Sequence, residues 1–250
     1  SPPAQGSTAH QHADEYRLVQ HIKAQAPAAQ HGQRAQRRRH RPGRAGAMEV
    51  LVDVPSGLAP RGVAIVAHPQ PLLGGSAQHK VPHLLARAAT GAGWLVLRPN
   101  FRGVGQSAGQ HDAGDGETTD LLWLAAQLRT DFPQQPLALI GFSFGAFVQA
   151  RVAAALQQAG QPADRVCLAG MPWGAVEGGR FYDTPQGLAH ALVVHGECDS
   201  RVPLAAVLNW ARPDGQVVSV VPGADHFFTG RLPVLRDLVL DFLARPGAAV

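Results

Sequence analysis

A serine lies at the centre of the pattern Gly-x-Ser-x-Gly, which here reads Gly141-Phe142-Ser143-Phe144-Gly145. An apolar run at 137–140 precedes the pattern, and an alanine-rich stretch follows it. A strand, a tight turn and a helix in this order are typical of a nucleophile elbow, where small flanking residues let strand and helix approach closely. The serine hydroxyl then stands above the sheet, at a helix N-terminus that favours negative charge. We therefore predict that Ser143 is a covalent nucleophile.

Two later segments hold candidates for the base and the orienting carboxylate that a nucleophilic serine needs. Both follow strand-like apolar runs, and in this architecture the acid precedes the histidine along the chain. His226 is the predicted base. Asp199 is the predicted acid, because it lies just before the expected start of a helix and fits the turn. Glu197 and Asp225 are the alternatives: Glu197 would point into solvent more easily, and Asp225, adjacent to His226, suits a local turn.

Acyl transfer also needs two backbone N–H groups directed at the developing oxyanion. Phe144, the residue after the nucleophile, is expected to supply one of them. The second should come from the loop that follows an early strand, here His68-Pro69-Gln70-Pro71. Because proline has no N–H, Gln70 is the predicted donor of this loop. His68 is expected to be a hydrogen-bonded structural residue and not a second base.

The loops that carry these residues lie between alternating strands and helices. Short apolar or alternating runs predict strands at 49–54, 62–67, 94–97, 137–140, 165–169, 191–194 and 217–221. Helical patterns occur at 81–89, 118–128, 146–156, 204–210 and 232–243. Such alternation predicts an α/β fold, with a mostly parallel sheet and helices on both faces. In such sheets the chemistry is placed at the carboxyl ends of the strands, where the candidate residues lie.

From about Met48 to its end the chain resembles the α/β-hydrolase superfamily. More narrowly, it is similar to the small bacterial serine hydrolases without a cap domain that are related to the dienelactone-hydrolase and serine-aminopeptidase-like branches. The matching segments appear in the family's order: His68-Pro69-Gln70-Pro71 with Gly74-Gly75, 98–107, 141–145, 195–203 and 223–228. The resemblance implies an α/β-hydrolase fold without a large cap domain.

Two positions depart from these relatives. Gln70 stands where close relatives usually carry a second histidine, in the sequence His-Pro-His-Pro. Known dienelactone hydrolases have a cysteine at the elbow, whereas this chain has Ser143, so that particular activity is not expected. The resemblance identifies the superfamily, but it does not identify the substrate.

The residues and the resemblance together predict a serine hydrolase. It would cleave a carboxylic ester, thioester or amide through an acyl-enzyme on a Ser143–His226–Asp199 triad. An acyltransferase that uses the same residues and a non-catalytic binding protein on a hydrolase scaffold are the alternatives. The expected partner is a small-molecule acyl substrate. The segment 170–190 is too short for a cap, and three of its residues are predicted to line an acyl or leaving-group pocket: Met171, Trp173 and Phe181.

No cofactor or metal ion is expected. The segment 103–108 matches the weak dinucleotide pattern Gly-x-Gly-x-x-Ala. A dinucleotide-binding turn must open directly into a helix, and the following glycines, at 109, 114 and 116, break any helix there. The two cysteines, Cys167 and Cys198, are too few for a disulfide scaffold or a cysteine metal site.

Positive charge is concentrated near the N-terminus of the 250-residue chain. Residues 1–47 carry eight basic and two acidic side chains, a net charge of +6, and the other residues sum to −2. Few large apolar residues occur at 1–47, so we expect a basic, disordered extension there and one α/β-hydrolase domain at 48–250. Because that domain is net negative, no nucleic-acid partner is required. No apolar run reaches membrane-spanning length, and we predict a cytoplasmic protein without a membrane partner.

Overall fold

Residues 36–43, 46–57 and 59–246 are described by the structure, a computed structural model of the chain. Its centre is an eight-stranded sheet with the strand order β1-β2-β4-β3-β5-β6-β9-β10. These strands are β1 (Gln36–Gly43), β2 (Gly46–Asp53), β3 (Gly62–Ala67), β4 (Trp94–Pro99), β5 (Leu137–Phe142), β6 (Arg165–Ala169), β9 (Ala191–Gly196) and β10 (Val218–Val221). The pairings β1–β2 and β2–β4 are antiparallel, and every pairing from β4 to β10 is parallel.

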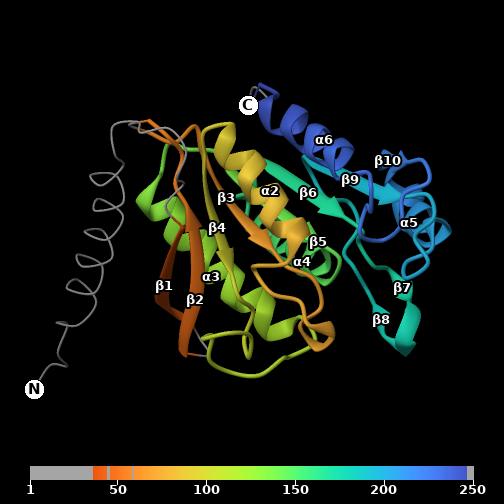
Figure 1. Ribbon diagram of the computed structural model, residues 1–250, viewed down its shortest axis with the longest axis horizontal. Coiled ribbons are helices and arrows are strands. Elements are labelled where there is room, and N and C mark those ends of the chain that lie inside the picture. Colours follow the sequence, from red (N-terminus) through yellow and green to blue (C-terminus); the bar gives the residue numbers. More distant parts are fainter. Residues whose placement is uncertain (1–35, 44–45, 58, 247–250) are drawn as a thin grey trace, which may run out of the picture.

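Helices cover both faces of this sheet (Figure 1). They are α2 (Lys80–Gly91), α3 (Asp115–Asp131), α4 (Phe144–Gln158), α5 (Leu204–Ala211) and α6 (Leu232–Ala244). The buried side chains of α2 and α6 join the core on one face, and those of α3, α4 and α5 join the core on the other. The mostly parallel sheet with two helical layers is confirmed. Within the described ranges, no helix combines the length and the apolar character needed to cross a membrane.

The central strands divide the core between the two faces. In β3, Val63, Ile65 and Ala67 pack on one side, whereas Ala64 and Val66 pack on the other, as the two-residue period of a strand requires. All six residues of β3 are buried, which is the pattern of a parallel strand covered on both faces. This burial holds the carboxyl ends of the central strands, and hence the loops that follow them, in a rigid frame.

The first edge of the sheet differs from the sequence prediction. β1 pairs antiparallel with β2, so the expected domain boundary between residues 47 and 48 falls inside a pair of strands. Strand pairing uses backbone N–H and C=O groups and needs no apolar side chains. The polar composition of this segment therefore gave no sign of it. Residues 1–35 of the predicted extension lie outside the described residues.

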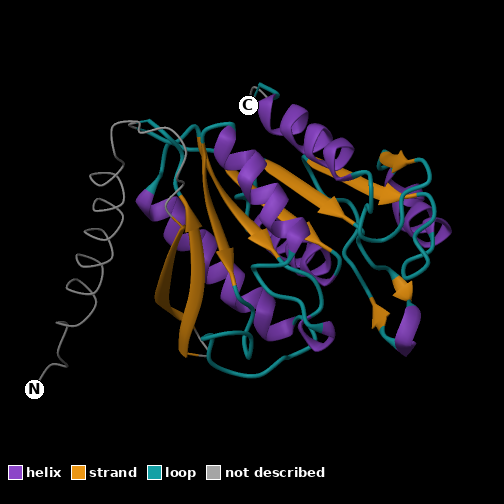
Figure 2. Cartoon of the chain, viewed as in Figure 1, coloured by secondary structure: helices purple, strands orange, loops and turns teal. Residues whose placement is uncertain are grey.

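A small hairpin fills the segment between β6 and β9. It contains β7 (Gly174–Ala175), the short 3-10 helix η2 (Glu177–Gly179) and β8 (Phe181–Tyr182), with β7 and β8 antiparallel. Figure 2 shows this hairpin beyond the end of the main sheet, attached by loops. It is far too small to form a cap domain, as the sequence predicted.

Candidate active site

Ser143 occupies the turn between β5 and α4. Its backbone has φ 56° and ψ −123°, a conformation that an L residue adopts only at an energetic cost of roughly 1–3 kcal/mol. The Ser143 N–H donates to the carbonyl of Ala169 at 2.9 Å, which ties the turn to the end of the neighbouring strand β6. The serine is partly exposed. Its hydroxyl is thus presented at the carboxyl edge of the sheet, just before the N-terminus of α4.

The two glycines of the pattern permit this turn through close approach of the backbone. A Cβ atom on Gly141 would lie 2.4 Å from the carbonyl oxygen of Gly145. A Cβ atom on Gly145 would lie 2.3 Å from the carbonyl oxygen of Ala67, at the end of β3. Both distances are too short for non-bonded atoms, so any side chain would push α4 away from the sheet. The glycines therefore allow the elbow to lie directly against the loop that follows β3.

Ser143, His226 and Asp199 form one chain of hydrogen bonds. The Nε2 atom of His226 lies 2.9 Å from the Oγ of Ser143, and its Nδ1 atom lies 2.7 Å from Oδ2 of Asp199. The side chain of Asp199 is fully buried and that of His226 is 6% exposed. The structure thus brings together the three residues that the sequence singled out, although 83 residues separate the serine from the histidine.

The second carboxylate oxygen of Asp199 is held by the backbone. Oδ1 accepts hydrogen bonds from the N–H groups of Arg201 at 2.9 Å and Val202 at 2.8 Å. Another buried histidine, His195, lies behind this turn and bonds through Nε2 to the carbonyl of Val202 at 2.7 Å. The turn therefore directs Oδ2 of Asp199 toward the imidazole of His226 at 2.7 Å, with Nε2 of His195 farther away at 3.4 Å.

The two alternative acids have other partners. Oε2 of Glu197 accepts from the Gly223 N–H at 2.8 Å, at an exposed position. Oδ1 of Asp225 accepts from the N–H groups of Phe227 at 3.1 Å and Thr229 at 2.9 Å. The hydrogen bonds from Thr229 hold the pKa of Asp225 below its ordinary value. Glu197 thus joins the loop after β9 to the loop after β10, Asp225 stabilises its own turn, and neither is bonded to His226.

Aromatic rings and one glycine hold the imidazole of His226 in place. The ring of Phe142 lies 5.2 Å from it, and the ring of Phe227 meets it edge-on at 5.2 Å. A Cβ atom on Gly170 would lie only 3.2 Å from Cε1 of His226. Packing on these sides restricts rotation of the ring, so that both of its nitrogen atoms stay in line with their partners.

Two backbone donors near the serine are free. Among the described residues, the N–H groups of Gln70 and Phe144 have no hydrogen-bond acceptor. The carbonyl of Gln70 accepts from Leu73 and Gly75, which shapes its loop around η1 (Pro71–Leu73). These are the two donors that the sequence predicted for an oxyanion hole. Their availability is the arrangement that a transient oxyanion needs.

His68 is a buried structural residue. Its Nδ1 lies 2.8 Å from the carbonyl oxygen of Pro69, and its Nε2 accepts from the Phe101 N–H at 3.0 Å. This pattern requires the neutral imidazole with the proton on Nδ1, because Nε2 must be an acceptor. Burial lowers the pKa of His68 to about 4. Its bonds join the loop after β3 to the loop after β4 and leave it no role as a base.

The low pKa of His68 makes stability depend on pH. Between pH 6.5 and about 4 the unfolded chain protonates this side chain and the folded chain does not, so the free energy of unfolding falls as the pH falls. The expected loss is about 3 kcal/mol over this window. Burial also lowers the pKa of His195, which adds to the loss in the same direction.

Urea unfolding at a series of pH values measures this effect. His68→Gln should give a flatter pH profile than the wild type, whatever its stability at neutral pH. The control His190→Asn removes an exposed histidine and should keep the wild-type slope. An equal slope in His68→Gln and the wild type would show that His68 does not contribute to it.

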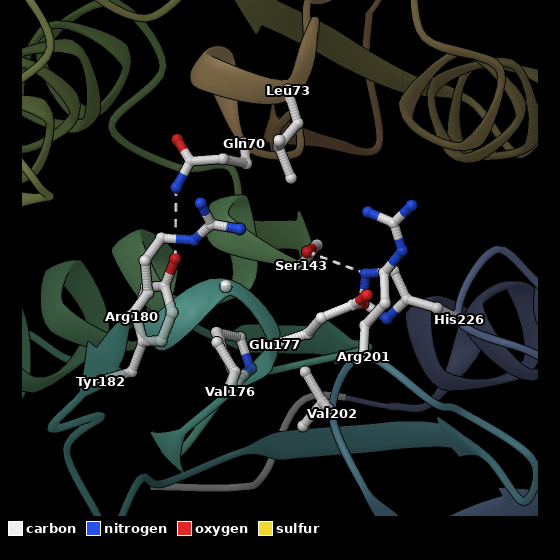
Figure 3. A pocket seen from close by; sticks show the side chains of 12 residues that line it. Gln70, Leu73, Ser143, Val176, Glu177, Arg180, Tyr182, Arg201, Val202 and His226 are labelled. Atoms are coloured by element: carbon white, nitrogen blue, oxygen red, sulfur yellow. Dashed lines mark hydrogen bonds between the residues drawn. The ribbon is translucent and has the colours of Figure 1, made fainter.

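Ser143 lines a cavity of about 310 Å³, called here the Ser143 cavity (Figure 3). Its lining includes Gln70, Val176, Arg180, Tyr182, Arg201 and His226. The amide Nε2 of Gln70 donates to the hydroxyl of Tyr182 at 3.2 Å, which joins the loop after β3 to the hairpin. No sequence pattern predicted a role for these hairpin residues.

The three pocket residues predicted from the sequence are not part of this lining. Met171 is fully buried in the core, Trp173 packs against that core, and Phe181 is 74% exposed. The short strands of the hairpin explain the error. Side chains alternate along a strand, so the neighbours Arg180 and Tyr182 reach the cavity and Phe181 points away from it.

Comparisons with known proteins identify the family of this fold. The family model for the alpha/beta hydrolase fold matches residues 64–185. A serine hydrolase without a lid from Xanthomonas campestris is 35% identical, with a TM-score of 0.74; the match covers 90% of this chain and 99% of that one. An alpha-beta serine hydrolase homologue from Coxiella burnetii is 34% identical, with a TM-score of 0.73, over 83% of this chain and 97% of that one.

A curated, uncharacterized protein of Rickettsia prowazekii is 40% identical over 87 residues. That match spans 34% of this chain and 37% of the relative, so the chain covers little more than a third of the relative's length. The two bacterial serine hydrolases, in contrast, align over almost their whole length. The identity, the extent of the match and the shared fold have one explanation: the chain belongs to the α/β-hydrolase family, in the group of serine hydrolases that lack a lid.

Proposed function

We propose that this hydrolase cleaves a carboxylic ester, thioester or amide through an acyl-enzyme on Ser143. The observation that carries the proposal is the hydrogen-bonded chain from Ser143 Oγ through His226 to Asp199, with distances of 2.9 and 2.7 Å. Ser143 and His226 line a cavity that accommodates a small acyl compound. A structural turn would not need a strained serine bonded to a buried histidine that is in turn bonded to a buried carboxylate.

The proposed reaction begins with attack of Ser143 Oγ on the substrate carbonyl. His226 Nε2 takes the hydroxyl proton, and Asp199 stabilises the imidazolium through Nδ1. The carbonyl oxygen becomes an oxyanion, which the N–H groups of Gln70 and Phe144 would bind. As the tetrahedral intermediate collapses, His226 gives its proton to the leaving group, and the acyl group stays on Ser143.

Water completes the cycle by the same steps. His226 takes a proton from the attacking water, a second tetrahedral intermediate forms, and the carboxylic acid leaves as Ser143 regains its proton. The rim of the cavity supports water as the acceptor. Leu73 is 57% exposed at this rim, and Glu177, which belongs to the hairpin, is also exposed, so water can reach the cavity.

A fluorophosphonate probe tests the proposed nucleophile. Its phosphorus takes the place of the substrate carbonyl, fluoride leaves, and a stable phosphonyl ester remains on the serine. Intact-mass and peptide mass spectrometry should find one adduct per chain, on Ser143, near neutral pH. Hydrolysis of 4-nitrophenyl esters should disappear in proportion to the labelling.

Ser200→Ala is the matched control. Ser200 is an exposed serine beside Asp199, and its removal should leave labelling of Ser143 intact, whereas Ser143→Ala should abolish labelling. Ester hydrolysis that continues at full rate in a fully labelled sample would exclude Ser143 as the nucleophile. So would an adduct on another residue.

A further inference from the structure

Two arginine side chains line the Ser143 cavity from different parts of the chain. Arg180 comes from the hairpin, just before β8, and Arg201 follows the turn that holds Asp199. In Figure 3 the guanidinium group of Arg180 is seen on the Gln70 side of Ser143, and that of Arg201 on the His226 side. A substrate at Ser143 would therefore lie between two cationic groups.

Neither guanidinium group is neutralised by a carboxylate within the described residues. Across the described part of the chain, Arg180 and Arg201 form no ion pair, and their guanidinium groups donate no hydrogen bond. Arg98, Arg102 and Arg151, by comparison, each pair with an aspartate at 2.6–2.9 Å. Both cavity arginines are nevertheless half-buried. A half-buried guanidinium with free donors is suited to bind an anion from outside.

Packing places Arg201 in a defined position beside the base. Its Cζ atom lies 4.9 Å from the ring centre of Phe227, in a cation–π contact. Phe227 in turn meets the imidazole of His226 edge-on. The aromatic ring thus supports both the base and the neighbouring guanidinium, so that Arg201 needs little ordering to bind a ligand at the cavity.

One acidic side chain, Glu177, shares the lining. In the described residues its carboxylate lies within 4.0 Å of neither arginine, since no ion pair joins them. With His226 neutral, the charged side chains of the cavity sum to +1. That balance matches a ligand with one negative charge better than a dianion.

We propose that the substrate of this hydrolase carries a carboxylate group, which Arg180 and Arg201 bind while Ser143 attacks the ester, thioester or amide bond. This inference rests on the proposed function of Ser143 and names the substrate class of that site. A guanidinium presents parallel N–H donors in the geometry of a carboxylate, and such charge-assisted bonds are stronger than neutral ones. Substrates without the charge lose these bonds and leave the arginines unpaired.

Matched pairs of esters measure the preference. In the first pair the charge is on the acyl group: mono-4-nitrophenyl glutarate against 4-nitrophenyl pentanoate, which has the same chain length. In the second it is on the leaving group: 4-acetoxybenzoate against its methyl ester. The measured quantity is the ratio of kcat/KM for the charged ester to kcat/KM for the neutral one, in each pair. The pair that responds tells which part of the substrate carries the carboxylate.

Substitution of either arginine should lower this ratio in at least one pair. Arg180→Gln and Arg201→Gln are each expected to reduce it by about 10-fold, and the corresponding Arg→Lys variants should restore part of it because the charge returns. Glu177→Gln should raise the ratio, since a repulsive charge is removed. Arg61→Gln is the control for overall charge. Arg61 is exposed and precedes β3, at the opposite end of the strand from the cavity, so its removal should leave the ratio unchanged.

The outcomes separate this inference from the proposed function. Ratios that stay the same in both arginine variants, for both pairs, would overturn the carboxylate inference, even while Ser143 is labelled by fluorophosphonate and neutral esters are hydrolysed. Failure of Ser143 to react with the probe would instead overturn the proposed nucleophile. A thermal unfolding midpoint close to that of the wild type shows that each variant is folded when its ratio is compared.

Discussion

Ser143→Ala is expected to lower kcat for ester hydrolysis by about 10³-fold or more. The change removes the one hydroxyl bonded to His226 Nε2 and leaves no group to form the acyl-enzyme. The backbone N–H groups of Gln70 and Phe144 and the cavity remain, so a small residual rate above that of water alone should persist. Steady-state kinetics on an ester that the wild type hydrolyses measure the loss.

The fold should tolerate this change. The side chain of Ser143 makes no capping hydrogen bond to α4. Alanine also has a Cβ atom, so the strain of this backbone conformation should be the same in the variant. The thermal unfolding midpoint should therefore stay close to that of the wild type. Retention of even a tenth of the wild-type kcat would mean that another nucleophile carries the reaction.

Asp199→Asn is expected to lower kcat by about 10²–10⁴-fold while the chain stays folded. The reason is the direction in which the amide must lie. The backbone N–H groups of Arg201 and Val202 donate to Oδ1, and in an asparagine they can donate only to the side-chain carbonyl oxygen. The amide NH₂ then faces Nδ1 of His226 and donates to it. This places the imidazole proton on Nε2, so that the ring cannot take a proton from Ser143.

The other two acids provide matched controls for Asp199→Asn. Glu197→Gln keeps an acceptor for the Gly223 N–H, and Asp225→Asn keeps one for Phe227 and Thr229. Each change removes one negative charge from the same region without touching His226, and each should cost far less than Asp199→Asn. A collapse of kcat in either control, with Asp199→Asn near the wild-type rate, would reassign the orienting acid.

The predicted elements from residue 62 onward agree with the structure because their signals are local. Six apolar residues in β3 and the run before Ser143 mark strands that are covered on both faces, and such runs need no knowledge of their neighbours. The β1–β2 pairing lacks this signal. It depends on backbone groups of two segments that meet only when the chain turns back on itself, and composition carries no record of that.

The sequence by itself determined the local chemistry of this protein. Gly141 allows the strained turn at Ser143, and the prolines around Gln70 remove N–H donors from their loop, because these constraints act between atoms close along the chain. The tertiary structure decided what lies opposite the serine. Parallel pairing of β9 with β6 and β10 brings two distant loops to one edge of the sheet, where backbone donors turn Asp199, and not Glu197 or Asp225, toward His226. It also decided the charge of the cavity. Arg180 lies in a segment without a recognisable pattern, and the matched segment 195–203 assigned no role to Arg201. Both line the cavity of Ser143 only because the hairpin and the turn after β9 converge there.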